Sequence, residues 1–188
     1  TAFVNGFNLN QGTLIFANNS AGTPPTITAG PVGTGTLSLA NGVAVMSDGT
    51  ARTIGNAVSV AGNFTFGSLD AMNARANAGN SLTLSGTVTL ASGAHTVSVN
   101  GLLMVGTITG QLTGGTNLAK SGPGTLVLQN AGNNYGGSTT VDAGILQIGA
   151  AGSIPDTSAL VVNSNGFFNL NGLAETVGSL AGDGVVTN

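Results

Sequence analysis

The stretch that decides the fold runs from Lys120 to Ile148 and reads KSGPGTLVLQNAGNNYGGSTTVDAGILQI. Apolar residues in it stand at every second position and alternate with small polar residues. This period of two is typical of strands that bury one face. No helical pattern lies between the runs, so the sequence predicts a repetitive all-β fold. The alternating apolar positions, including those further along the chain, are Leu126, Leu128, Leu146, Ile148, Leu160, Val162, Phe168 and Leu170.

The spacing of these runs favours a solenoid. Twenty residues separate Leu126 from Leu146, and twenty-four separate Leu146 from Leu170. Repeats of about 20–25 residues, each made of short strands and turns, suit a right-handed parallel β-helix in which each coil stacks on the last. Gly-Thr-Leu units, which open further alternating runs, begin at Gly12, Gly35 and Gly124.

The side chains fit such a coil. We expect Leu, Val, Ile and Phe to point inward, and Thr, Ser, Asn and Gln to point outward. Glycine and asparagine suit the corners because both accept a positive φ at low cost. The strands expected from the pattern cover residues 3–9, 12–16, 35–39, 43–46, 57–60, 63–66, 81–84, 87–90, 96–99 and 102–107.

The composition is that of a packed but weakly charged protein. Of the 188 residues, 32 are glycine, 41% are apolar and 5% are charged, against a typical charged fraction of ~25%. A disordered chain would combine low hydrophobicity with high charge. Three basic residues cannot form a phosphate-binding face, so nucleic acid is not an expected partner. The absence of cysteine excludes disulfides and thiolate metal sites.

No linker, charge block or change of composition divides the chain, so we expect a single β-helix domain over residues 1–188. Residues 17–31 contain Pro24, Pro25 and Pro31, and a protruding turn is expected there because proline removes ladder donors. Residues 67–80 are the least strand-like part and are expected to form a wide loop. The first thirty residues lack the pattern of a secretion signal, which predicts either an intracellular protein or a mature fragment of a longer one.

Residues 120–188 resemble a known family, the autotransporter-associated β-strand repeat, also called the passenger-associated transport repeat. The segments Ser121–Leu128 and Asn133–Ile148 carry the resemblance most clearly. Pro123, Asp142 and Ile145 depart from the usual pattern without disturbing an inward position. Weaker similarity extends to Arg52–Val58, Gly62–Gly67, Gly152–Pro155 and Glu175–Gly182.

The resemblance implies a right-handed parallel β-helix that is exported across a bacterial outer membrane and displayed on, or released from, the cell surface. This chain would then be a passenger segment. The family is functionally diverse, so the resemblance implies no substrate.

The carboxylates are candidates for polysaccharide chemistry, which needs several acids grouped on adjacent coils. Asp48 and Asp70 are twenty-two residues apart, and Arg52 and Arg75 are twenty-three apart, so each pair could stack on one edge of the coil. A solvated ion ladder is the more common result of such spacing. The remaining carboxylates are Asp142, Asp156, Glu175 and Asp183.

Other chemistry-bearing residues favour structural roles. His95 is the only histidine, no acid is near it in sequence, and we expect an exposed strand residue rather than part of a triad with Ser92 or Ser98. Tyr135 is expected to pack against a coil corner rather than to stack on carbohydrate. We therefore predict no catalytic, cofactor-binding or metal-binding residue, and no cofactor. Gly33–Gly35 and Gly122–Gly124 are expected to be coil corners, because the lysine of a phosphate loop is missing.

Neither end of the sequence shows a polar cap, and an uncapped β-helix exposes unpaired backbone. We therefore predict a non-catalytic extracellular structural module: a β-helical passenger stalk or a subunit of a self-assembling surface filament. The expected partners are copies of the chain or further coils of its parent, and possibly cell-surface glycans. Two alternatives remain open, namely a polysaccharide-binding or polysaccharide-degrading β-helix and a surface adhesin. Acids clustered in one groove would favour the polysaccharide alternative.

Overall fold

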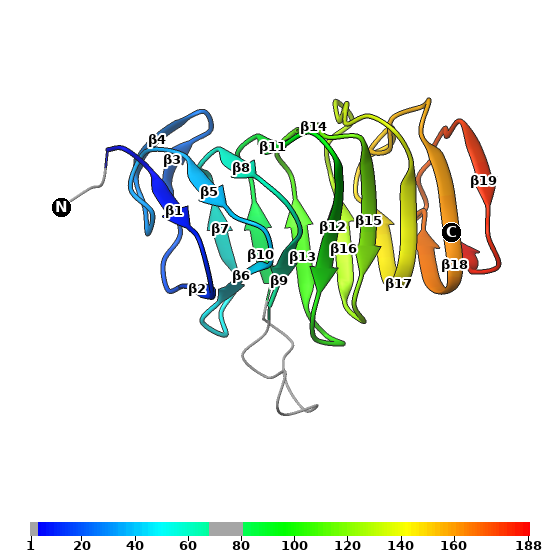
Figure 1. Ribbon diagram of the computed structural model, residues 1–188, viewed down its shortest axis with the longest axis horizontal. Coiled ribbons are helices and arrows are strands. Elements are labelled where there is room, and N and C mark those ends of the chain that lie inside the picture. Colours follow the sequence, from blue (N-terminus) through cyan, green and yellow to red (C-terminus); the bar gives the residue numbers. More distant parts are fainter. Residues whose placement is uncertain (1–3, 68–80) are drawn as a thin grey trace.

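The computed structural model describes residues 4–67 and 81–188. Within these ranges the chain is all-β, with parallel strands stacked as a β-solenoid and without a helix, which confirms the predicted fold class. Figure 1 shows the strands lying side by side along the long axis, with the N-terminal coils at one end and the C-terminal coils at the other.

The chain visits three faces in turn, which we number in that order. Face 1 is a separate five-stranded parallel sheet that occupies the N-terminal part of the solenoid (Figure 1). Its strands, in stacking order, are β1 (Phe7–Leu9), β5 (Leu37–Leu39), β8 (Val58–Val60), β11 (Val88–Leu90) and β14 (Leu112–Gly114).

Faces 2 and 3 join into one larger sheet because two long strands, β17 (Thr139–Ile148) and β18 (Ala159–Asn169), continue around the corner between them. The other strands of face 2 are β2 (Thr13–Phe16), β6 (Val43–Ser47), β9 (Phe64–Phe66), β12 (Ala94–Val99), β15 (Asn117–Ser121) and β19 (Ser179–Ala181). The other strands of face 3 are β7 (Arg52–Ile54), β10 (Ser81–Leu84), β13 (Val105–Ile108), β16 (Thr125–Leu128) and β20 (Val185–Thr187).

The strand register gives the length of each coil. Leu126 lies beside Leu146, twenty residues further along the chain, as the sequence predicted. Phe7, in contrast, lies beside Leu37, thirty residues further on, because the intervening coil contains residues 17–31. Coils of different length therefore stack in register, since the extra residues leave the solenoid wall and return to it.

The core is one continuous stack of inward side chains. In most strands alternate residues are buried, as in Val58 and Val60 of β8, while Ser59 between them is exposed. Burial of this apolar surface, at roughly 25 cal/mol per Å², is the main term that holds the coils together. Among the fully buried side chains the largest are Phe16, Phe64, Phe66, Lys120, Leu37, Leu39, Ile54, Leu82, Leu84, Met104, Ile108 and Leu112.

Residues 17–31 differ from the predicted protruding turn. They contain an antiparallel hairpin of β3 (Ala21–Thr23) and β4 (Thr26–Ala29), with Pro24 and Pro25 at its turn. Ile27 of this hairpin is buried and packs over Gly55, where a β-carbon would clash with its Cδ1 atom. The hairpin folds back on the wall because Ile27 gains burial there. The loop predicted at 67–80 lies, from residue 68 on, outside the described residues.

A second predicted strand begins later than the sequence indicated. The sequence predicted a strand over residues 102–107, but β13 begins only at Val105, and Gly101 has a φ of +120° in the preceding turn. Leu102 and Leu103 therefore lie at the corner between faces 2 and 3, where they are 77% and 59% exposed. The sequence prediction placed a strand here because both residues are apolar, but the turn at Gly101 prevents a strand at these positions.

The outward side chains of face 3 correct the expectation that outward positions are polar. Residues Val105, Thr125, Ile145, Phe167 and Val185 stand beside one another in successive coils. Phe167 and Val185 in this row are 44% and 43% exposed. The corresponding row of face 1 is polar throughout and consists of Asn8, Ser38, Ser59, Thr89 and Thr113.

Candidate functional site

A groove opens where face 1 stops. Beyond β14, residues 129–138 and 149–158 take the place of face 1 strands. Asn134 and Gly136 still donate backbone hydrogen bonds to Leu112 and Gly114 of β14, at 3.0 and 3.3 Å. The segment after them does not continue this ladder. The result is an open groove of about 640 Å³ lined by Ala131, Asn133, Asn134, Tyr135, Gly136, Gly152, Ile154, Pro155, Asp156 and Thr157.

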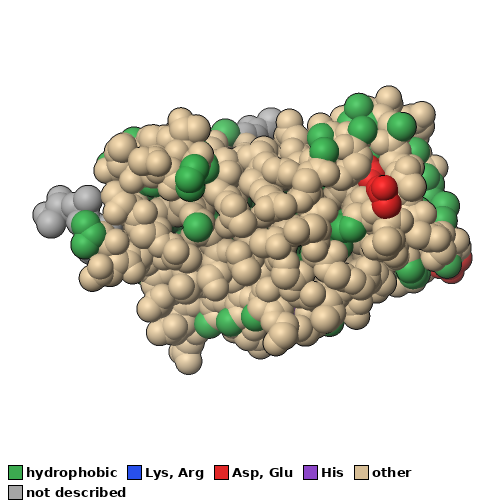
Figure 2. Space-filling model, turned by 90° about the horizontal axis from the view of Figure 1, so that it is seen from above, with side chains coloured by type: hydrophobic (Ala, Val, Ile, Leu, Met, Phe, Trp, Pro, Cys, Tyr) green, Lys and Arg blue, Asp and Glu red, His purple; other side chains and the backbone are tan. Residues whose placement is uncertain are grey.

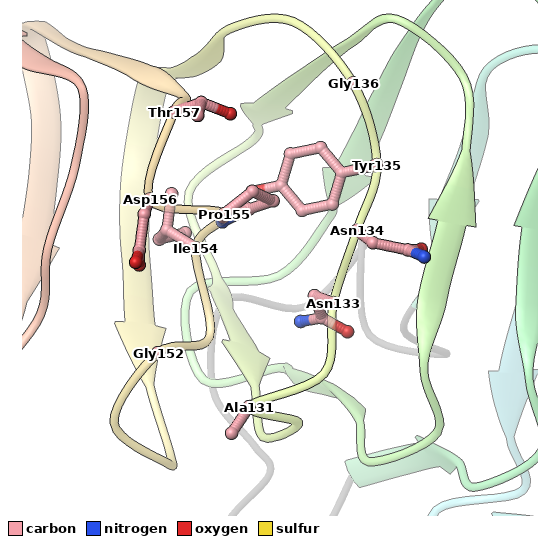
Figure 3. A pocket seen from close by; sticks show the side chains of 10 residues that line it. All are labelled: Ala131, Asn133, Asn134, Tyr135, Gly136, Gly152, Ile154, Pro155, Asp156 and Thr157. Carbon is pink, nitrogen blue, oxygen red and sulfur yellow. The ribbon is translucent and has the colours of Figure 1, made fainter.

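The side chains around this groove do not converge on one point. Figure 3 shows the ring of Tyr135 beside Pro155, while Asn134 points to the right and Asp156 points downward, so neither is directed at the other. Tyr135 is only 2% exposed, so its ring face is not free for a ligand to stack on. A binding or catalytic pocket normally aims a few polar groups at the same place, and this groove does not.

Beneath the groove, buried hydroxyl groups bond to one another. The hydroxyl of Tyr135 and that of Thr139 are 2.8 Å apart, and Thr139 is in turn 2.8 Å from the hydroxyl of Ser158 in the next coil. Burial raises the pKa of Tyr135 far above its ordinary value. This arrangement keeps the phenol neutral and ties two coils together. Tyr135 thus packs inside the coil, near the position that the sequence predicted.

Glu175 fastens the last loop to the coil before it. Its carboxylate accepts backbone hydrogen bonds from Gly152, Ser153 and Ile154 at 3.1, 3.2 and 3.0 Å. Desolvation raises the pKa of Glu175, and the three N–H donors oppose that shift. A carboxylate that holds three backbone N–H groups is occupied as a structural clamp. The sequence marked Glu175 as an acid but gave no sign of this role.

The other described carboxylates are dispersed. Asp48 forms an ion pair with Arg52, at 2.6 Å, and the hydrogen bond from Arg52 lowers the pKa of Asp48. Asp142 accepts a hydrogen bond from Asn163 in the next coil. Within residues 4–67 and 81–188, no three His, Asp or Glu side chains form a group that could hold a metal ion. Asp70 and Arg75, the predicted partners of Asp48 and Arg52, lie outside the described residues.

His95 corrects the prediction of an exposed strand residue. It occupies an inward position of β12 and is 2% exposed. Its Nδ1 atom lies 3.0 Å from the carbonyl oxygen of Gly62, and its Nε2 atom lies 2.8 Å from that of Ala91. The ring therefore bridges one coil to the coil before it. Its position two residues before Val97, which also points inward, was the signal that the sequence offered.

Lys120 is the residue whose role the sequence analysis missed. It is fully buried, and its ammonium group donates to the carbonyl oxygens of Ser121, Gly122 and Ala143 at 2.8, 2.8 and 2.9 Å. Burial lowers the pKa of Lys120 to about 8. The available signal was the alternation itself, because Lys120 follows Leu118 by two residues and so shares its inward face.

Buried amides connect the coils in the same way. Asn56 donates to the carbonyl oxygens of Gly33 and Gly35 at 3.1 and 2.7 Å. Asn133 accepts a hydrogen bond from the backbone of Leu112 and donates one to Ser153, at 2.8 and 2.9 Å. These two buried amides thus serve contacts between coils.

The surface agrees with this description. Figure 2 shows a face made mostly of uncharged polar side chains and backbone, with hydrophobic side chains scattered over it and carboxylates toward the C-terminal half. Among the described residues there is no helix long and apolar enough to cross a membrane.

Comparison with known proteins agrees with the fold. The family described as Passenger-associated-transport-repeat matches residues 118–148. The adhesin BmaC autotransporter of Brucella suis biovar 1 (strain 1330) is 38% identical over 109 residues, which are 57% of this chain and 3% of that protein. The chain therefore corresponds to a small part of that relative. No solved structure gives a significant match.

The stacked parallel coils define the fold as a β-solenoid, and the matched repeat lies within it. Residues 118–148 are a passenger-associated transport repeat. The repeat match and the similarity to an autotransporter both support the predicted resemblance to autotransporter passengers.

Proposed function

We propose that this chain is a non-catalytic structural module of an extracellular passenger, either a β-helical stalk segment or a subunit of a self-assembling surface filament. Its partners are further coils of the parent chain or other copies of the chain. The module works outside the cell, after export across the bacterial outer membrane. The observation that carries the proposal is the continuous stack of parallel coils, in which buried polar side chains bond to the backbone of their own and adjacent coils.

The last two strands, β19 and β20, expose backbone and apolar side chains. Within residues 4–67 and 81–188, both pair only with β18. Leu180 and Val186 lie beside the buried residues Leu160 and Phe168, yet they are 58% and 42% exposed. A row of unpaired N–H and C=O groups above apolar side chains is a template for another strand.

A structural role also fits the polar groups of the solenoid. The side chains of Glu175, His95 and Lys120 all form hydrogen bonds with the backbone of their own or an adjacent coil. The exposed side chains of the groove diverge, which does not favour the polysaccharide-degrading alternative. These contacts support a scaffold rather than an enzyme.

Adhesion is a second candidate, and the similarity to an adhesin autotransporter favours it. The polar row on face 1, which includes Ser59 and Thr89, would offer hydroxyl groups to a cell-surface glycan. Specific binding on a glycan array, lost in a variant with both Ser59→Ala and Thr89→Ala, would support adhesion through this face.

Light scattering and electron microscopy of the purified chain test the structural proposal. We expect the mass to grow with concentration and short end-to-end assemblies to form. Leu180→Lys places a charge on β19 and is expected to abolish this growth. Leu102→Lys is the matched control, because Leu102 is equally apolar and 77% exposed but lies at a corner; it is expected to associate like the unmodified chain.

A chain that stays a monodisperse monomer at high concentration would contradict the proposal. So would association that Leu102→Lys reduces and Leu180→Lys leaves intact, because the contact would then run along the side of the solenoid.

A further inference from the structure

Lys120 occupies a position in the core where its neighbours are aliphatic. In the register of face 2 it stands between Val97 of β12 and Val141 of β17. All three side chains are fully buried. A positive charge here is costly, because burying an ammonium group requires that hydrogen-bond acceptors replace water.

The ammonium group finds acceptors for all of its hydrogens. An ammonium has three hydrogens to donate and no acceptor capacity, and Lys120 makes three hydrogen bonds to carbonyl oxygens. Two of these oxygens belong to Ser121 and Gly122, in the corner that follows Lys120 on its own coil. The third belongs to Ala143, in the corner of the next coil. The first two acceptors are local, and the third depends on how the next coil is aligned.

A slipped coil would lose the third acceptor. A slip of two residues keeps the alternation of inward and outward side chains, but it moves the carbonyl of Ala143 by roughly 6.6 Å along the strand. That oxygen would then lie beyond hydrogen-bonding distance of Lys120. The carbonyl that replaces it is that of Val141 or Ile145, which lie in the strand segments on either side of the corner and not in the corner itself.

An alignment that skips a whole coil would also misplace the third acceptor of Lys120. If β18 stacked on β15 in place of β17, Val162 and Asn165 would take the places of Val141 and Ala143. Between these two pairs the register shifts by one residue, because the corner of β18 is longer than that of β17. The carbonyl that should meet the ammonium group of Lys120 would therefore be displaced.

Apolar contacts alone do not distinguish the native alignment from one in which a coil is skipped. The inward residues of β18 at this place, Leu160 and Val162, are as suitable for burial as Thr139 and Val141 of β17. Hydrophobic burial is non-directional, whereas a single buried polar residue can fix the alignment of repeated elements. We propose that Lys120 selects the register of the next coil, because its ammonium group is satisfied only when the carbonyl of Ala143 lies beside it.

Disulfide cross-linking can read the register directly, because the chain contains no cysteine. Ala119 of β15 lies beside Thr140 of β17 in the native alignment. Neighbouring strands are ~4.8 Å apart, which a disulfide can bridge. The pair Ala119→Cys with Thr140→Cys therefore reports the native register. Ala119→Cys with Asp142→Cys reports a slip of two residues, and Ala119→Cys with Val161→Cys reports a skipped coil.

We expect that only the native pair cross-links in the unmodified background. Lys120→Met, which removes the ammonium group but keeps a long side chain, is expected to transfer at least a tenth of the cross-linked product to the other two pairs. Leu126→Met is the matched control, because it introduces methionine at a buried position of the same coil without touching Lys120. It is expected to give the native pair alone.

Cross-linking of the native pair alone in Lys120→Met would overturn the proposal. If Lys120→Met does not fold, Lys120→Gln decides the question, because its amide has two hydrogens for three carbonyl oxygens. Slipped product above that of the unmodified background would then support register selection, and the native pair alone would overturn it.

Discussion

At the scale of single residues, Lys120 places a positive charge inside an aliphatic core and so makes the stability of the fold depend on pH. Its pKa falls from 10.5 to about 8 on burial. Between these two values the unfolded chain binds more protons than the folded chain. The free energy of unfolding therefore rises as the pH increases through this window.

We predict that the stability of the unmodified chain, relative to that of Lys120→Gln, increases from pH 8 to pH 10. The full gain is on the order of 3 kcal/mol, because each unit of pKa shift corresponds to about 1.4 kcal/mol. Urea unfolding of both proteins at several pH values measures it. Tyr135 titrates in the same way in both, so its effect cancels in the difference. Parallel curves for the two proteins would show that the charge of Lys120 is not desolvated in the fold.

The roles of individual polar residues were the least predictable part of the molecule. The alternation placed His95 and Lys120 on inward positions, but residue type argued for exposure, since both are usually found at the surface. The acceptors that make burial possible are backbone carbonyls such as those of Gly62 and Ala143, which lie in other coils. A sequence does not show which carbonyl is left free at a corner. The stacking of Asp70 on Asp48 and of Arg75 on Arg52 stays a prediction. So does the single domain over residues 1–188.

At the scale of elements, the corners limit which residues the chain tolerates. Gly144 lies inside β17 at the corner between faces 2 and 3 and has a φ of +67°. A β-carbon there would come within 2.4 Å of the carbonyl oxygen of Gly122 and 2.6 Å of that of Gly124. Gly172 also has a positive φ, +73°, but has open space around the same position. Comparing alanine substitutions at these two glycines therefore distinguishes the cost of backbone strain from that of steric clashes between coils.

We predict that Gly144→Ala destabilises the fold by about 3 kcal/mol or more, since strain and backbone clashes add. Gly172→Ala is expected to cost about 1 kcal/mol, the cost of a left-handed conformation alone. Chemical denaturation of both variants measures the difference. Equal losses of stability would mean that the coils are not packed as closely at this corner as described.

Strands were largely predictable because each one leaves a local mark, the alternation of inward and outward side chains. This held for Leu126 and Leu128 of β16 and for Leu146 and Ile148 of β17. The strand prediction failed at Leu102 and Leu103, which are exposed on a turn. It also failed at residues 21–29, because the prolines there argued against the two short strands of the hairpin. In both places a tertiary contact or a turn overruled the local pattern.

At the scale of the whole molecule, stacking tolerates coils of unequal length. The step from Leu126 to Leu146 takes twenty residues and that from Phe7 to Leu37 takes thirty, yet both pairs lie side by side. Only the residues on the wall must match their neighbours, so insertions at corners change the surface and not the core. A passenger built this way can carry different surface features on one repeated scaffold.

The central claim is that coils stack in order along one axis. One outward row of face 3 runs through it in register: Thr53, Thr83, Thr107, Val127, Gln147, Asn169 and Thr187. The chain has no cysteine of its own, so cysteines can be placed at position 53 and at one further position of this row and spin-labelled. Double electron–electron resonance then measures the distance between the two labels.

We expect distances from Thr53 of about 19 Å to Gln147, about 24 Å to Asn169 and about 29 Å to Thr187, an increase of ~4.8 Å for each coil. Distances that do not increase in this order, or that are the same for all three positions, would contradict the stacked solenoid.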